Sequence, residues 1–346
     1  MLNLTAKIKI GGRVFTSVAS VKITTSVEDF MDTATLVLPQ VERGQVKEND
    51  EVSIELGYEN VCMNYEFFGK VSEISPASPY EIRCLDPFNE LRRKYLQRNF
   101  ESQPIHKILL SLLKDTGYSL DVSPLSAARK RNVKLSAVTF DGYKNLPMTV
   151  RKAIAKLATD HGYFAYFEGR RLVFNDRNLP LIFSKVPLYK ESENIIENSL
   201  LYHEGETVKK VTVYSDSKGG IPLRGSWISQ KVKNSTIEKK FDVSGFSSDG
   251  DCIRRAKELS DQLNAPGYTG DLKTFGYPFV RAGQLCAIQM KTEKQPTIQA
   301  VKGTEVSFDS GGYRRRITPT STTNDVYSSN PFFSFQSLNY FGRVAS

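Results

Sequence analysis

Apolar and polar residues alternate along most of the first 90 residues, which is the pattern of strands with one buried face. The first run places Leu4, Ala6, Ile8 and Ile10 on one side and ends at a glycine pair suited to a hairpin turn. Further alternating runs occupy residues 14–15, 18–25, 33–38, 51–56, 66–74 and 80–84. So many short strands in this length are typical of a small barrel or sandwich. We therefore expect residues 1–90 to form a first, tube-like β-barrel domain.

The apolar spacing then lengthens to three and four residues, which indicates helices. Asp86-Pro87 can cap a short helix, and residues 103–117 and 147–162 favour two longer ones, each ended by a glycine. The apolar positions expected to face the core are Ile105, Ile108, Leu109, Leu112, Leu113, Val150, Ile154, Leu157 and Ala158. We also expect one strand over residues 133–140 and an aromatic hairpin over residues 163–174. Residues 91–197 are therefore predicted to be an α+β insertion.

Alternation returns from residue 198 onward, with strands expected at 200–203, 208–214, 223–229 and 237–241. One helix interrupts them over residues 249–263, capped at Ser247, Ser248 or Asp249. Its inner side is expected to carry Ile253, Ala256, Leu259 and Leu263. The strands that follow, over residues 268–319, are punctuated by glycine and proline, and Gly311-Gly312 suits a hairpin turn. We expect residues 198–319 to form a second tube-like β-barrel domain.

Residues 320–346 form a linker and an aromatic tail. The tail carries Phe332, Phe333, Phe335, Tyr340 and Phe341 but is too short for a core of its own. Such a segment is expected either to grip a partner or to dock on the chain's own second β part.

Composition and charge narrow the class of protein. The chain has 346 residues, of which 40% are hydrophobic and 25% charged, as in a globular protein of two or three domains. The net charge is +9, but the basic residues are dispersed along the chain and gather only in three short clusters. These are Arg92-Arg93-Lys94, Arg129-Lys130-Arg131 and Arg314-Arg315-Arg316. None is a long basic arm, so a solvated face or a protein interface is favoured over direct contact with nucleic acid.

The four cysteines lack metal-ligand or redox spacing, and each lies among apolar residues, so we expect small buried hydrophobes. They are Cys62, Cys84, Cys252 and Cys286. The chain opens directly into alternation, and no apolar run is long enough to cross a bilayer. We expect a protein that is soluble when made and is not exported by the common route.

The sequence offers few candidates for catalytic or ligand-binding residues. His161 is expected to be a cation at a helix C-terminus, and His106 lies in a first helical turn. His203, beside Glu204 and Glu206, comes closest to an acid–base site, but a surface strand end is favoured. Phosphate loops, dinucleotide glycines, paired zinc histidines and nucleophile elbows are absent from the sequence. We therefore predict no catalytic, cofactor-binding or metal-binding residues.

The order of these parts resembles the late control gene D family of phage tail proteins, the baseplate hubs of contractile tails. The same fold forms the base of spike proteins in type VI secretion and related machines. The matching stretches are residues 21–39, 102–117, 148–174 and 270–306, within a resemblance that covers most of residues 1–318.

The resemblance implies a homotrimer in which two barrels per chain make a pseudo-sixfold ring, adapting a sixfold tail tube to a threefold spike. Many relatives continue into an oligosaccharide-binding-type barrel and a β-helical spike, whereas this chain ends in its short tail. The expected partners are thus a separate spike protein and the tail tube protein, with tape-measure and wedge proteins as further candidates. DNA would only pass through the lumen, and no membrane is involved. The expected location is the tail baseplate of a virion assembled in the host cytoplasm.

Two sets of residues are then expected at interfaces. Arg314, Arg315 and Arg316 are predicted at a ring interface, with binding of DNA phosphate in the lumen as the opposing hypothesis. The five tail aromatics are predicted to contact the spike or a neighbouring subunit. Two other functions stay open: a tail-associated cell-wall hydrolase and a basic nucleic-acid-binding protein.

Overall fold

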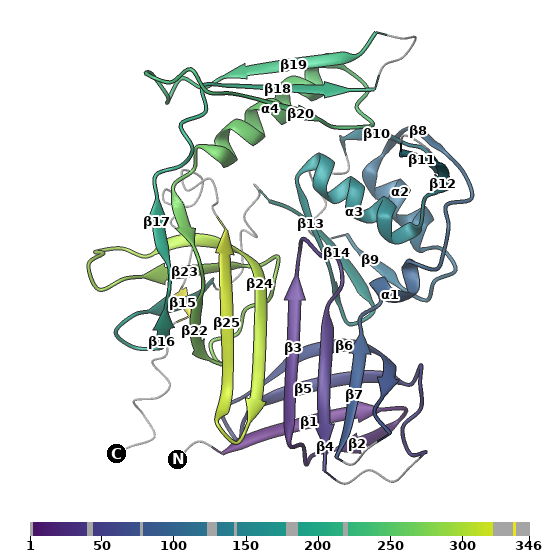
Figure 1. The fold of residues 1–346 in the computed structure, drawn as a ribbon, viewed down its shortest axis with the longest axis vertical. Coiled ribbons are helices and arrows are strands. Elements are labelled where there is room, and N and C mark those ends of the chain that lie inside the picture. Colours follow the sequence, from purple (N-terminus) through teal and green to yellow (C-terminus); the bar gives the residue numbers. More distant parts are fainter. Residues whose placement is uncertain are drawn as a thin grey trace.

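The computed structural model describes residues 3–39, 44–76, 79–122, 130–141, 144–177, 186–216, 221–320 and 335–336. Figure 1 shows two β parts side by side in the lower half of the molecule, with the helices of the insertion above the first part. A smaller unit of one helix and three strands lies at the top, beyond the second β part. The prediction of a mainly β chain is confirmed, but the two closed barrels that were expected are not present in the described residues, where the main sheet is open.

The first β part contains seven strands where alternation predicted them. They are β1 (Leu4–Ile10), β2 (Arg13–Phe15), β3 (Ser20–Ser26), β4 (Thr33–Leu38), β5 (Glu51–Tyr58), β6 (Cys62–Ile74) and β7 (Tyr80–Leu85). Inward residues such as Ile8, Ile23 and Ile54 are completely buried, as the period of two requires. Their core also takes in Val306, Phe308 and Tyr313 from the end of the chain.

The insertion has its own core, built from three helices and several short strands. The elements are α1 (Phe88–Leu91), β8 (Phe100–Pro104), α2 (Ile105–Leu113), β9 (Ser119–Asp121), β10 (Asn132–Leu135), β11 (Val138–Asp141), β12 (Lys144–Pro147), α3 (Val150–His161), β13 (Tyr163–Glu168) and β14 (Arg171–Asp176). All nine apolar helix positions predicted to face the core are buried. The carboxylate of Asp86 accepts the Phe88 amide at 3.1 Å and so supports the start of α1, which follows Pro87 and ends at Leu91.

One predicted strand of the insertion is divided in two. Instead of one strand over residues 133–140, β10 pairs with β8, and β11 pairs with β12. The single-strand prediction was wrong because alternation continues through the break at Ser136, whereas the two halves have different partners.

The second β part and the unit at the top alternate along the chain. The sheet strands are β15 (Val186–Lys190), β16 (Ile195–Asn198), β17 (Leu201–His203), β21 (Gly267–Thr269), β22 (Leu272–Phe275), β23 (Leu285–Gln289), β24 (Thr297–Asp309), β25 (Gly312–Thr320) and β26 (Phe335–Gln336). The top unit comprises β18 (Lys210–Ser215), β19 (Leu223–Ile228), β20 (Glu238–Asp242) and α4 (Asp249–Leu263).

The helix α4 has the predicted bounds, and the Ser248 side chain caps it by accepting the Asp251 amide. Its predicted inner face needs one correction, because Ile253 is 44% exposed while Cys252 and Ala256 are buried. Strand β19 lies against the backbone of α4: a Cβ atom on Gly225 would stand 2.2 Å from the Ile253 nitrogen. This close approach selects the rotation of the helix that buries Cys252.

Fourteen strands of the described residues belong to one sheet, whose main path is β16-β22-β25-β24-β3-β4-β7-β6-β5-β1-β2. The path is open, because β16 and β2 at its two ends are not paired with each other in the described residues. Strand β3 pairs with β24, so residues from opposite ends of the chain are neighbours. The threonine hydroxyls of Thr25 and Thr304 meet there at 2.8 Å in a buried contact.

The two β parts repeat one strand arrangement in the same chain order. In the first, β3 pairs with β4, β4 with β7, β7 with β6, and β6 with β5. In the second, β16–β17 pairs with β21–β22, β22 with β25, β25 with β24, and β24 with β23. The top unit therefore occupies the position of the short turn between β3 and β4. We call the two arrangements the first and second β repeats.

Backbone details confirm this correspondence. In the first β repeat, Asn49 donates to the Val71 carbonyl and the Val71 amide donates to Asp50, both at 2.9 Å. In the second, Gly283 donates to the Val301 carbonyl and the Val301 amide donates to Gln284, both at 2.8 Å. Asn49 and Gly283 both have left-handed backbones, with φ of 67° and 86°. Irregular pairing follows Val71 in one repeat and Val301 in the other. The repeats thus share local geometry as well as strand order.

Candidate assembly interface

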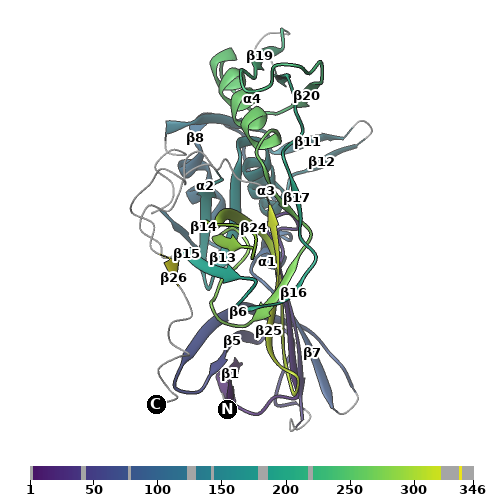
Figure 2. The ribbon, with the colours of Figure 1, turned by 90° about the vertical axis from the view of Figure 1, so that its left-hand side faces the viewer.

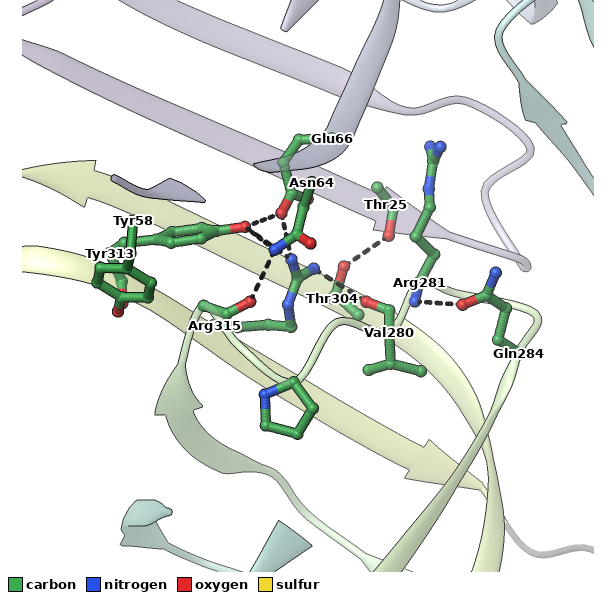
Figure 3. Close-up of polar contacts among 12 residues, drawn as sticks. Thr25, Tyr58, Asn64, Glu66, Val280, Arg281, Gln284, Thr304, Tyr313 and Arg315 are labelled. Carbon is green, nitrogen blue, oxygen red and sulfur yellow. Dashed lines mark hydrogen bonds and ion pairs between the residues drawn. The ribbon is translucent and has the colours of Figure 1, made fainter. Parts of the chain in front are cut away.

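The first β repeat and the end of the chain are joined by a buried polar cluster. Figure 3 shows Asn64 and Glu66 from β6 meeting Tyr313 and Arg315 from β25. Glu66 forms an ion pair with Arg315 and accepts a hydrogen bond from the Tyr313 hydroxyl. The Arg315 guanidinium also donates to the Val280 carbonyl at 2.9 Å. Both charged side chains are 1% exposed, so the charged form of each is stabilised by the opposite charge of the other.

The electrostatics of this cluster favour a charged arginine. Burial alone would lower the pKa of Arg315, but Glu66 and the neighbouring tyrosines raise it above its ordinary value. Burial and the adjacent Glu66 raise the pKa of the Tyr313 hydroxyl, so it stays protonated and donates. The cluster is a buried ion pair within the core, which suits a structural role.

A second buried ion pair links the β3–β4 turn to the second β repeat. The Arg281 guanidinium lies 3.2 Å from the Asp32 carboxylate, and both side chains are almost fully buried. Burial raises the pKa of Asp32 to about 6 even though Arg281 lowers it. The pKa of Asp86 is raised by burial and by the nearby Asp32. Together, the two ion pairs fasten the repeats at separate points.

The predicted arginine triplet is divided between core and surface. Arg315 points inward, while Arg316 is exposed and pairs with Asp271 at 2.8 Å. Arg314 is partly exposed and lies over the Phe275 ring, 4.9 Å from its centroid. A strand period of two explains the division, and alternation with buried Tyr313 and Ile317 was a sequence signal for it. Arg314 and Arg316 are the members of the triplet that a partner can reach.

Most of the predicted aromatic contacts lie outside the described residues. This applies to Phe332, Phe333, Tyr340 and Phe341. The backbone of Phe335 belongs to β26, which pairs in parallel with Val186 and Pro187 of β15. The interface role of the five tail aromatics stays a prediction.

The prediction that His161 is a helix-end cation was wrong. The residue ends α3 but is 2% exposed, and burial, followed by nearby Arg131 and Arg255, lowers its pKa well below the usual 6.5. These arginines supply the positive charge instead: Arg131 donates to the His161 carbonyl at 2.7 Å, and Arg255 to the Thr159 carbonyl at 3.1 Å. His106 and His203 lie where predicted, in the first turn of α2 and at the end of β17.

The described part of the chain contains few groups suited to catalysis or metal binding. It contains no group of three or more histidine, cysteine or acidic residues that could hold a metal ion. All four cysteines are free, and three are buried as predicted, with Cys62 half-buried. Within the same residues, no helix is long and apolar enough to span a membrane.

One polar cavity of about 400 Å³ lies beside α1 and is lined by Asp86, Glu90 and Tyr118 among others. Two of its carboxylates are engaged: Glu90 pairs with Lys70 and accepts from the Tyr118 hydroxyl, and Asp86 accepts a backbone amide. The cavity lies where the first β repeat meets the insertion, and these contacts favour a structural junction.

Comparison with solved structures shows the same fold in tail proteins. A prophage MuSo2 43 kDa tail protein from Shewanella oneidensis matches with a TM-score of 0.64 at 13% identity, over 92% of this chain and 98% of that one. A tail protein from Neisseria meningitidis MC58 matches with a TM-score of 0.62 at 13% identity, over 92% and 96%.

The fold also occurs outside phages. An E. coli component of the type VI secretion system, itself similar to the phage T4 tail proteins gp27 and gp5, matches with a TM-score of 0.55. Its identity is 10%, over 95% of this chain and 79% of that one. No known family pattern matches the sequence, and no curated protein is detectably similar to it in sequence. The chain therefore has the fold of phage tail and type VI secretion proteins.

Proposed function

We propose that the protein is the structural hub of a contractile tail baseplate or a related injection machine. In this proposal three copies form a ring that adapts a sixfold tail tube to a threefold central spike. The observation that carries the proposal is the internal repeat: β3–β7 follow the same arrangement as β16–β17 with β21–β25, and β3–β7, β16 and β22–β25 belong to one sheet. Three such chains present six equivalent units, which is the number that a sixfold tube requires.

The open sheet supports assembly. A sheet that ends in unpaired strands invites pairing with another chain, and a closed cyclic ring removes that hazard. Barrel-like closure of the repeats, which the single chain lacks among its described residues, would then be completed between copies. The domain limits 1–90, 91–197, 198–319 and 320–346 belong to this proposal.

The rigid connection between the repeats also supports an adaptor. The β3–β24 pairing and the buried pairs Glu66–Arg315 and Asp32–Arg281 hold the two units in one orientation. A ring that copies the sixfold symmetry of a tube needs this constraint, because two loosely linked units would not keep equal spacing.

The proposed partners follow from this role. They are two further copies of the chain, a separate spike protein and the tail tube protein, with tape-measure and wedge proteins as further candidates. Arg314, Arg316 and the aromatic tail are proposed contacts, and DNA passes through the lumen without being held. The protein has no enzymatic role in this account, and its place is the baseplate of the virion or injection machine.

The mass of the purified full chain in solution, measured by light scattering with and without a candidate spike protein, tests the proposal. We expect the mass of three copies, alone or in complex with the spike. One copy in both samples would contradict it. Peptidoglycan clearing by the same preparation would instead favour a hydrolase, and steeply salt-dependent DNA retention a nucleic-acid-binding protein.

A further inference from the structure

Each β repeat has one strand edge that is unpaired, although the equivalent edge of the other repeat is paired with a strand. In the centre of the sheet, β24 of the second repeat covers β3 of the first. The counterpart of β24 is the end of β6, and the counterpart of β3 is β16–β17. Within the described residues, neither is paired with another strand on this edge. Figure 1 places β16 and β17 at one side of the molecule and β6 at the other.

We infer that β16–β17 of one copy pairs with the end of β6 of the next copy, in the register of the β3–β24 junction. The inference rests on the proposed function, because it supplies the contact that closes the ring. The contact is head-to-tail, since it uses two different edges, and such contacts generate rings when the rotation closes.

Residue correspondence fixes the register. The shared irregularity aligns Val71 with Val301, so residues 73–76 correspond to residues 303–306. On the other strand, Thr24 lies opposite Thr33 and Leu201 lies opposite Thr269. Leu36 and Leu272 lie opposite Ile82 and Ile317, which in turn lie opposite Ile74 and Thr304, so Leu36 corresponds to Leu272 and Thr33 to Thr269. Residues 24–26 therefore correspond to residues 201–203. Because Thr304 pairs with Thr25 and Glu305 with Thr24, Ile74 should face Tyr202, and Ser75 should face Leu201.

Residues at the internal β3–β24 junction are buried, whereas the corresponding residues on the two unpaired edges are exposed. At the internal junction, Thr25 is 4% and Val306 is 1% exposed, because each strand covers the other. Their counterparts are open in the single chain: Tyr202 is 56% exposed, and Pro76 is exposed. Leu201 next to it is 71% exposed. An edge that presents large apolar side chains is a template for strand pairing.

Pro76 sets a limit to the pairing. It corresponds to Val306, and proline has no amide hydrogen to donate, so the ladder is expected to stop there. The junction between copies is consequently shorter than the internal one, which runs from Gly303 to Phe308. A short junction suits a ring whose copies must assemble from separate chains.

Cysteine cross-linking of the full chain tests the register. Directly opposed residues of an antiparallel pair hold their Cβ atoms about 4.5–5.5 Å apart, close enough for a disulfide after small adjustment. The test variant carries Ser75→Cys and Leu201→Cys, with Cys62→Ser to remove the half-buried native thiol. After mild oxidation, we expect chains covalently linked into trimers on a non-reducing gel.

Two matched variants control the result. Thr24→Cys with Glu305→Cys has the same register within one chain, so it should form an intrachain disulfide and show that the geometry permits one. Ser75→Cys with Tyr202→Cys puts the thiols on opposite faces and should not cross-link.

The outcomes separate this inference from the function on which it rests. A trimer by mass that does not cross-link, while the intrachain control does, would overturn the strand junction and leave the hub proposal standing. Cross-linking of the opposite-face pair as efficiently as the test pair would also overturn the register. Monomers at every concentration, with and without the spike protein, would overturn both.

Discussion

At the scale of single residues, the most consequential side chain is Arg315, which is buried within a run of three arginines. Charged residues are rarely buried without a partner, and here Glu66 provides it from the other end of the chain. The pair connects β6 with β25 where the two repeats meet. Its value lies in position, since two apolar residues could stabilise the core equally well.

Removing one member of this pair should be costly. We expect Arg315→Met to lower the free energy of unfolding by about 3–5 kcal/mol, because Glu66 would remain buried without its partner. Arg316→Met is the matched control: its pair with Asp271 is solvent-exposed, so the loss should be about 0–1 kcal/mol. Urea unfolding measures both, and similar losses would contradict the burial of Arg315.

The buried His161 should make stability depend on pH. Its folded pKa is well below 6.5, so the unfolded chain binds a proton at mildly acidic pH while the folded chain does not. The part of the free energy of unfolding that the neutral His161 ring contributes is therefore lost progressively as pH falls below about 6.5. His161→Gln should remove this slope relative to the unmodified protein. Parallel stability curves between pH 7 and pH 5 would show that the ring is not buried and neutral.

At the scale of elements, one tight turn recurs in both repeats and uses a different residue in each. Asn49 and Gly283 occupy the left-handed conformation at the same point, and asparagine is among the few residues besides glycine that accept it. At Gly283 a side chain is excluded by space as well, since an added Cβ would lie 2.5 Å from the Tyr166 ring. This turn thus also fixes how the insertion rests on the second repeat.

We expect Gly283→Ala to destabilise the protein by about 2–4 kcal/mol through backbone strain and overlap with Tyr166. Gly250→Ala is the control, because Gly250 lies in the first turn of α4 with its nearest neighbouring atom 3.6 Å from an added Cβ. That change should be neutral or stabilising by up to about 1 kcal/mol. Thermal unfolding compares them, and equal effects would contradict the close contact at Gly283.

The sequence predicted where helices and strands lie better than it predicted which of them pack or pair together. The bounds of α4 and the buried faces of α2 and α3 followed from apolar spacing and capping residues, which are local properties. The pairing of β3 with β24 joins residues near position 25 to residues near position 304, and no local pattern contains it. The rotation of α4 depends on Gly225 in another strand. The division of the arginine triplet, however, was available from alternation with Tyr313 and Ile317.

At the scale of the whole molecule, the chain is two versions of one β arrangement held in a fixed orientation. The second version carries a unit of about sixty residues where the first has a short turn, which hides the repeat in the sequence. Neither repeat completes its sheet alone. These features together explain why a single chain would need copies of itself, and why three copies would resemble a ring of six.

The measurement that tests this account most directly is single-particle imaging of the purified full chain, alone and with a candidate spike protein. The account predicts threefold rings with a central hole, in which six β units of alternating kind surround the axis and the top units mark every second one. Separate monomers in both samples, or a ring with a different number of copies, would contradict it.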